Sequence, residues 1–568
     1  MSVIIYKNAV KALVYFIIFT ALILTSNQNI SAQISIDTSF EGANARVLSI
    51  NNAANTVKIE SRLRTGDIHN VVFYCKISGF NVKQPLKIQV KYTQLYYLPV
   101  LAAYSYDQIN WYRFSGTIVG DSKEFTRTYS QSPVYFAHGY PYVYTDLLNL
   151  VSNISFSPFV QISNLATSFG GRNVKLVKIT EPCVPDSGKY LVWLLGRNHA
   201  MESHSNYVIV GMINFLVSND IKADRLRRQA IIYIVPVMDV DNAAIGGTGK
   251  DRLPVDFNRD WDGPSYWPAV IAVKQKLAET VSLNPLKIFI DSHNPFPGSP
   301  GVNERLFFYS LYSSGPKSIN LDFYRKLFFE NGSYALDRQP AYATNGQTSA
   351  RYVDSMYSAL EFSSSLETGW VNRTDNLEWT IPLYKLNGEM LGKTINDYLS
   401  NLIRPGDVIV DNTDSSGVII TGQWFPSTNV SGYWGSNYLH DGNIDKGSKS
   451  VKYSPSITSE GFYEVFLRWT QDAARANNTP VRIAYNGGIK DTNVNQQTRG
   501  AEWVPLGIYN FTSGSIGNIL IQTTGTSGFV IADAVRLSKR NTCSLIGIIN
   551  NNFTLRFSIS AYPNPFNP

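Results

Sequence analysis

The sequence predicts a multidomain protein with an N-terminal β-sandwich, a central α/β/α domain built on a mixed sheet, and a C-terminal β-sandwich. The chain has 568 residues, more than one hydrophobic core usually serves. Its composition, 44% hydrophobic and 16% charged, is typical of globular domains. Short alternating apolar runs fill both ends of the chain, whereas strands alternate with helix-length segments in the middle. We therefore expect folded domains at residues 33–132, 133–403 and 407–540.

The first 32 residues are typical of a secretory signal peptide. Lys7 and Lys11 precede an apolar run over residues 12–24, and a short polar stretch then leads to a cleavage site after Ala32. The alternative is a membrane anchor, but the apolar run is short for a span. We therefore expect a secreted or cell-surface protein.

Charge and cysteine content restrict the class further. The formal net charge of +7 is spread along the chain without a block rich in Lys and Arg, so we expect no nucleic-acid partner. Cys75, Cys183 and Cys543 cannot all pair, and their spacing fits neither a disulfide framework nor a zinc cluster. We expect each to be a small buried hydrophobic side chain. An exported chain with so few cysteines is typical of bacteria.

The N-terminal domain is predicted by short runs in which apolar and polar residues alternate. Turn residues separate these runs, and no helical period appears, so an antiparallel β-sandwich fits. The clearest runs are 56–60, 71–75, 86–92 and 100–105.

The central domain is predicted by strands that alternate with helices. This order indicates a parallel or mixed sheet covered on both faces, with its site at the carboxyl ends of the strands. The expected strands are 190–195, 230–236, 286–291 and 362–366, and the expected helices are 203–216, 267–281 and 383–403.

Residues 407–540 return to β runs, which predict the second β-sandwich. The strongest runs are 417–420, 461–469, 481–485, 519–522 and 528–537.

Two histidines and a glutamate follow strands of the central domain and form a candidate metal site. His199 and Glu202 come after the strand 190–195, three residues apart, so one turn of chain can aim both at one point. His293 follows the strand 286–291. Two imidazoles and a carboxylate form a ligand set of catalytic zinc that leaves a position for water.

Further candidates lie on a loop between these ligands and at another strand end. An Asn-Arg pair, Asn258 and Arg259, could hold a terminal carboxylate, because Arg binds carboxylates by two parallel hydrogen bonds. Glu367 follows the strand 362–366 and is better placed to act as a base than its competitors Glu361 and Glu378.

The order of these motifs, and their places at strand ends, resemble the zinc carboxypeptidase (funnelin) family. The resemblance covers this chain from about residue 33 to residue 403. The preceding β-sandwich makes the chain most similar to the cytosolic-carboxypeptidase-like branch and its bacterial relatives. The motifs are His199-x-x-Glu202, Asn258-Arg259, His293 and Glu367.

The resemblance implies one zinc ion per chain, held by His199, Glu202 and His293. It also implies roles in substrate binding and proton transfer for four residues, namely Asn258 and Arg259 as the carboxylate clamp, Arg252 as stabiliser of the scissile carbonyl and its oxyanion, and Glu367 as general base and then acid.

Two assignments stay open. Lys250 is a rival of Arg252 on the same loop. Tyr342 and Tyr352 are both candidates for the Tyr that closes over the substrate in this family.

The C-terminal domain is similar to a golvesin-type module, on residues 422–425, 432–435 and 531–535. Exposed aromatic rings there could stack on a carbohydrate or another cell-surface ligand, although burial in the core of the sandwich is the favoured interpretation. Residues 562–568, within the segment 541–568, resemble the beginning of a type IX secretion sorting domain, and we expect the natural chain to continue.

We therefore expect a secreted zinc metallocarboxypeptidase that hydrolyses the C-terminal peptide bond of peptides or proteins, with a zinc-activated water and a Glu general base. The alternatives are a murein-peptide hydrolase or amidase on the same scaffold, and a catalytically inactive protein that binds a surface or carbohydrate.

Overall fold

The computed structural model describes residues 33–92, 101–297, 305–332, 337–340, 348–370 and 378–540. The predicted signal peptide, the predicted sorting segment and Tyr342 lie outside these ranges. The chain forms two compact units. The first comprises Met1–Thr180, Lys189–Ala223 and Ala230–Lys393, and the second comprises Glu181–Gly188, Asp224–Gln229 and Thr394–Pro568.

Two sheets around one core form the predicted N-terminal β-sandwich. Alternate side chains of both sheets, such as Cys75 and Phe136 from one and Ile88 and Phe125 from the other, fill that core. Strands β3 and β5 pair in parallel, so the expected antiparallel arrangement is wrong at this point. The sheet orders are β1 (Ser35–Asp37), β4 (Tyr74–Ser78), β10 (Val134–Ala137), β6 (Leu101–Ser105), β7 (Trp111–Ser115), and β2 (Arg46–Asn51), β3 (Thr56–Glu60), β5 (Leu86–Lys91), β9 (Ser122–Arg127), β8 (Thr117–Val119).

The predicted mixed sheet of the central domain is confirmed. Its inner strands β14, β13, β15 and β18 run parallel, and antiparallel neighbours flank them on both sides. Parallel strands direct their carboxyl ends to one edge, where sites of α/β proteins form. The order is β11 (Val160–Thr167), β12 (Asn173–Ile179), β14 (Ala230–Val235), β13 (Tyr190–Gly196), β15 (Leu286–His293), β18 (Phe362–Thr368), β16 (Leu306–Ser310), β17 (Asp337–Pro340).

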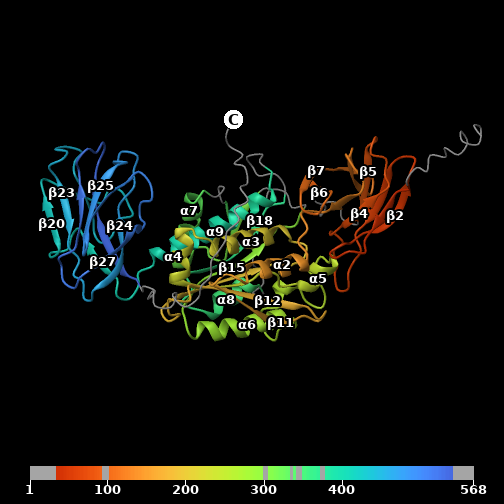
Figure 1. Cartoon of the computed structure of the whole chain (residues 1–568), viewed down its shortest axis with the longest axis horizontal. Helices are drawn as coiled ribbons and strands as arrows, with labels where there is room; N and C mark the ends of the chain where they lie inside the picture. Colours follow the sequence, from red (N-terminus) through yellow and green to blue (C-terminus); the bar gives the residue numbers. More distant parts are fainter. Residues whose placement is uncertain are drawn as a thin grey trace, which may run out of the picture. The chain divides into compact units, whose positions relative to one another are not determined.

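Helices cover both faces of this sheet (Figure 1). Successive side chains of β18 point to opposite faces of the sheet. The ring of Phe362 contacts Tyr324 of α7 on one face, and the hydroxyl of Ser363 donates to Ala350 O of α8 on the other. A Cβ at Gly211 of α3 would overlap the backbone of Lys385 of α9, so glycine allows these helices to pack closely. The helices are α2 (Tyr144–Ile154), α3 (His204–Leu216), α4 (Ile221–Gln229), α5 (Val240–Ile245), α6 (Pro268–Val281), α7 (Pro316–Glu330), α8 (Ser349–Met356) and α9 (Ile381–Asn401).

The second unit contains the predicted C-terminal sheets, whose strands pair antiparallel and share a core that includes Val451, Val465 and Ile521. Their orders are β19 (Val408–Asp411), β30 (Ala534–Lys539), β24 (Gly461–Arg468), β27 (Val504–Phe511), then β20 (Val418–Thr421), β23 (Ser450–Tyr453), β28 (Asn518–Gln522), β25 (Thr479–Tyr485), β26 (Gly488–Val494), and β21 (Phe425–Ser427), β22 (Tyr438–His440), β29 (Ile531–Ala532).

Two further features concern the helices and the cysteines of the described residues. None of the helices in the described ranges has the length and apolar character needed to cross a bilayer. Cys75 is a free, buried thiol, as expected. Cys183 is disulfide-bonded, so the prediction that every cysteine is a simple buried hydrophobe is wrong for this residue.

Candidate active site

The turn that follows β13 is fixed by a buried arginine. Arg197 adopts a left-handed backbone conformation (φ 58°), which sharply redirects the chain after Gly196. Its guanidinium donates to Ala200 O at 2.7 Å, and also to Tyr142 O and Asn206 Oδ1. These bonds hold the backbone between strand β13 and helix α3 in one conformation.

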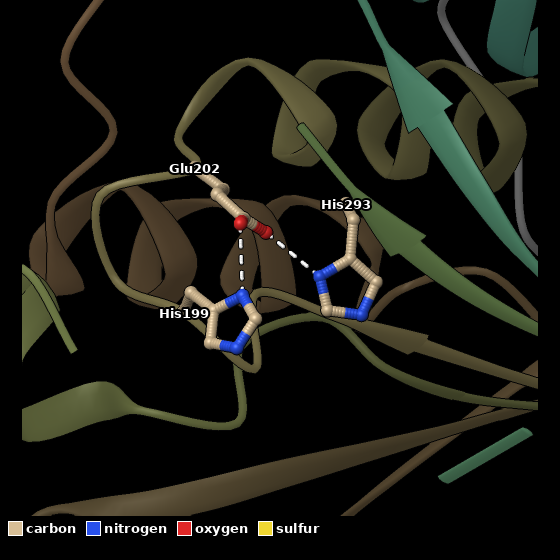
Figure 2. A group of neighbouring side chains, drawn as sticks. All are labelled: His199, Glu202 and His293. Atoms are coloured by element: carbon tan, nitrogen blue, oxygen red, sulfur yellow. Dashed lines mark hydrogen bonds and ion pairs between the residues drawn. The ribbon is translucent and has the colours of Figure 1, made fainter. Parts of the chain in front are cut away.

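His199, Glu202 and His293 converge at the carboxyl edge of the sheet (Figure 2). Glu202 Oε1 lies 2.8 Å from His199 Nδ1, and Glu202 Oε2 lies 2.7 Å from His293 Nδ1. One ligand atom from each residue lies within 4.8 Å of the others, and all three side chains are buried. Two imidazole nitrogens and a carboxylate at this spacing fit a catalytic zinc ion.

A second carboxylate contacts the far nitrogen of each imidazole. Asp256 Oδ1 lies 3.0 Å from His199 Nε2, and Asp291 Oδ2 lies 2.8 Å from His293 Nε2. Such carboxylates orient the ring and leave the other nitrogen free to bind metal. The sequence analysis assigned no role to Asp256 or Asp291, although Asp291 lies in the strand that leads to His293 and Asp256 in the loop of Asn258.

Lys250, not Arg252, contacts the candidate ligands. Lys250 Nζ lies 2.8 Å from Glu202 Oε1. The Arg252 guanidinium instead stacks on Trp267 at 4.5 Å, donates to Thr65 O and lies 3.5 Å from Asp239 Oδ2. The assignment of Arg252 to the reaction centre therefore finds no support in its placement, because its side chain is directed toward Asp239 and Trp267.

The buried charges at this site affect one another. Burial alone would lower the pKa of Lys250, but the carboxylates of Glu202 and Glu367 raise it above its usual value. Burial alone would raise the pKa of Glu202, but His199, Lys250 and His293 hold it well below the usual range. Glu202 is therefore an anion, as a metal ligand must be.

Glu367 lies beside the candidate ligands. It is the Cα partner of His293 on the adjacent strand β18, and its side chain is buried. Among the described residues, its Oε2 atom has no hydrogen-bond partner. Burial raises the pKa of Glu367 to about 7. The two competing glutamates are elsewhere, since Glu361 pairs with Lys287 and Glu378 accepts a hydrogen bond from Tyr140.

The Asn-Arg pair lies on a short 3-10 helix, η2 (Phe257–Arg259). Asn258 is buried, with Nδ2 3.1 Å from His293 Nε2. The Arg259 side chain is exposed, and its Nη1 donates to Asn258 O. Asn258 therefore lies against a candidate metal ligand, while Arg259 next to it is accessible to solvent. Tyr352, on α8, contacts Trp261.

Comparisons with known proteins agree with this geometry. Residues 148–282 match the zinc carboxypeptidase family model, and residues 36–138 match the cytosolic carboxypeptidase N-terminal domain. Over these two segments the chain is similar to zinc carboxypeptidases. His293 and Glu367 lie beyond the segment that matches the zinc carboxypeptidase model, and the fold places them beside the ligand candidates inside it.

Curated relatives of this chain include cytosolic carboxypeptidase 6 of Caenorhabditis elegans, 33% identical over 173 residues, which are 29% of this chain and 37% of that protein. A metallo-carboxypeptidase of Pseudomonas aeruginosa has a similar structure, with a TM-score of 0.57 and 22% identity over 64% of this chain and all of that one. A metallo-carboxypeptidase of Burkholderia cenocepacia gives the same TM-score at 18% identity, over 64% of this chain and 98% of that one. At these identities the likeness shows the fold.

The chain also matches a second kind of protein. Residues 408–539 match the Golvesin C-terminal domain model, as the sequence suggested. Xanthan lyase of Bacillus sp. (strain GL1) is 38% identical over 145 residues, which are 24% of this chain and 16% of that protein. The chain thus spans well under two thirds of the curated relatives it matches. Trp424 and Trp434 pack against cores of the module, in agreement with the favoured interpretation.

Proposed function

We propose that this protein is a zinc metallocarboxypeptidase that removes the C-terminal residue of peptides or proteins. The convergence of His199, Glu202 and His293 beside the unpaired oxygen of Glu367 carries the proposal. A buried carboxylate oxygen without a hydrogen-bond partner lowers the stability of the folded state. Such a group in a native fold therefore calls for an explanation, of which a catalytic role is one. Proton transfer at a metal centre is such a role.

Substrate binding and proton transfer are divided among the side chains at this strand edge. Zinc at such a site supplies an activated water and a Lewis acid for the scissile carbonyl. Arg259 and Asn258 bind the terminal carboxylate through N–H donors. As the oxygen of water adds to the carbonyl carbon, Glu367 accepts a proton, and it returns this proton to the amine nitrogen when the C–N bond breaks.

The developing negative charge needs a fixed cation, and we assign this role to Lys250 in place of Arg252. Lys250 contacts the ligand group, whereas Arg252 is held by Asp239 and Trp267. A positive charge already in position stabilises a transition state without reorganisation.

Secretion to the exterior of a bacterial cell is the second part of the proposal. The signal-like residues 1–32 and the sorting-like residues 562–568 support it. The match to the golvesin module and to part of xanthan lyase is consistent with a surface ligand for the C-terminal unit.

The experiment incubates the zinc-loaded full chain with several peptides, each in two forms. One form has a free C-terminal carboxylate and the other is amidated, and the release of the last residue is measured for both. The proposal predicts release of the last residue from the free form only, and loss of this activity after chelation. Cleavage of both forms at equal rates would indicate the amidase alternative. Zinc binding without cleavage of any peptide would contradict the proposal.

A further inference from the structure

The loop 248–253 connects the candidate metal site with the N-terminal sandwich. On the side of the metal site, Met201 N donates to Thr248 O at 2.9 Å, next to Glu202. Lys250 Nζ reaches Glu202 Oε1 on the same side. The position of this loop therefore decides where the charge of Lys250 lies.

On its other side, the loop is held by residues 65–69, which connect β3 and β4 of the sandwich. The carboxylate of Asp67 accepts from two consecutive amides, Thr248 N at 2.7 Å and Gly249 N at 2.9 Å. Thr248 Oγ1 donates to His69 O, and Leu253 N donates to the backbone of residue 66, each at 2.7 Å. Charge-assisted bonds such as those of Asp67 are the stronger kind.

The conformation of the loop explains why such support is needed. Gly249 (φ 72°) and Asp251 (φ 51°) lie on either side of Lys250, and both are left-handed. This conformation is unfavourable for a residue with a Cβ, so Asp251 holds it only with help from its surroundings. A Cβ at Gly249 would lie 2.8 Å from Ala200 N, so the loop passes very close to the turn that carries His199 and Glu202.

We propose that Asp67 of the N-terminal sandwich is a positioning residue of the active site, which holds the loop 248–253 so that Lys250 stays against Glu202. The inference rests on the proposed function for its effect on turnover. The sandwich is then a part of the active site, because one of its buried carboxylates fixes the backbone that carries Lys250.

The test uses Asp67→Asn in the zinc-loaded full chain. The amide keeps the size of the side chain but replaces an acceptor oxygen with a donor that faces a backbone N–H. We expect hydrogen–deuterium exchange in 248–253 to rise at least tenfold, and kcat to fall about tenfold with little change in KM. In a Lys250→Met background, Asp67→Asn should change kcat less than twofold, since its effect acts through Lys250.

The matched control is Asp107→Asn. Asp107 belongs to the same sandwich and accepts from the amides of Ile109 and Asn110, but it does not contact the loop. Its substitution should leave exchange in 248–253 and kcat unchanged. If Asp67→Asn does not fold, Thr248→Val removes only the bond to His69 O and should raise exchange in the same loop to a smaller extent.

The inference would be overturned if Asp67→Asn left hydrogen–deuterium exchange in 248–253 unchanged. It would also be overturned if Asp67→Asn lowered kcat by the same factor in the wild-type and in the Lys250→Met background. Because exchange is measured without turnover, it decides the inference even if no peptide is cleaved, so a failure of the proposed function is recognised separately.

Discussion

His293 and Glu367 are Cα partners at the carboxyl ends of the parallel strands β15 and β18. This pairing places a candidate metal ligand beside a buried carboxylate from a distant part of the chain. His293 directs Nδ1 toward Glu202, while Glu367 Oε2 has no hydrogen-bond partner among the described residues. One residue can therefore hold the metal while its neighbour exchanges a proton with the substrate.

The first prediction concerns Glu367. Glu367→Gln should lower kcat at least a hundredfold, because general acid–base catalysis contributes about 10²- to 10⁴-fold. Zinc content should stay at one ion per chain, measured by elemental analysis. Glu361→Gln is the control at a glutamate that pairs with Lys287, and it should keep its activity. An active Glu367→Gln enzyme would reject the assignment.

The second prediction concerns the carboxylate behind His293. Asp291→Asn should weaken zinc binding about 10- to 100-fold, the usual effect of losing a carboxylate that orients a metal-binding histidine. Competition with a chromophoric chelator measures this affinity. Asp262→Asn is the control, because Asp262 lies close to η2 in the chain but has no hydrogen bond or ion pair to the described residues of the site. Equal affinities of the Asp291→Asn and wild-type chains would contradict the account.

The third prediction separates the two rival cations. Lys250→Met should lower kcat about 10²- to 10³-fold, the range seen when one group that stabilises an oxyanion is removed. Arg252→Met should instead lower the denaturation midpoint, since the Arg252 guanidinium packs on Trp267 and lies beside Asp239. Steady-state kinetics and urea unfolding of both variants check this pair. The reverse pattern would restore Arg252 to the reaction centre.

The fourth prediction is a pH dependence of stability. His138 is buried, and its burial lowers the imidazole pKa from 6.5 to about 4. The unfolded chain therefore binds the proton more tightly, so the stability from this group is complete above pH 6.5 and is lost as the pH falls toward 4. Between pH 7 and pH 5 the loss is about 2 kcal/mol. Urea unfolding should show a shallower pH slope for His138→Gln than for the wild type, and identical slopes would refute this origin.

Much of the fold could be predicted from the sequence because apolar runs and turn residues report local structure directly. The strand expected at residues 190–195 is β13, and the helix expected at 203–216 is α3 within one residue at its start. Strand β15 ends at His293 and strand β18 ends at Thr368, so His293 and Glu367 lie at the ends of strands that were expected to stop shortly before them. Parallel pairing of β3 with β5 is a long-range contact, which alternation within each strand does not reveal.

The candidate site was predictable where residue type and strand end coincide, as for His199 and His293. The supporting carboxylates were not, because Asp256 and Asp291 differ from other aspartates only in what the fold places next to them. The choice between Lys250 and Arg252 could not be predicted either, because both lie in a loop whose left-handed residue Gly249 contacts Asp67, which is far away in the sequence.

The most direct measurement is the metal content of the purified full chain and of its His293→Ala variant. The account predicts one zinc ion per chain in the wild type and less than a tenth of that in the variant, with the secondary structure of both unchanged by circular dichroism. A wild-type chain that binds no zinc, or a variant that retains it fully, would contradict the central claim that these side chains hold one metal ion.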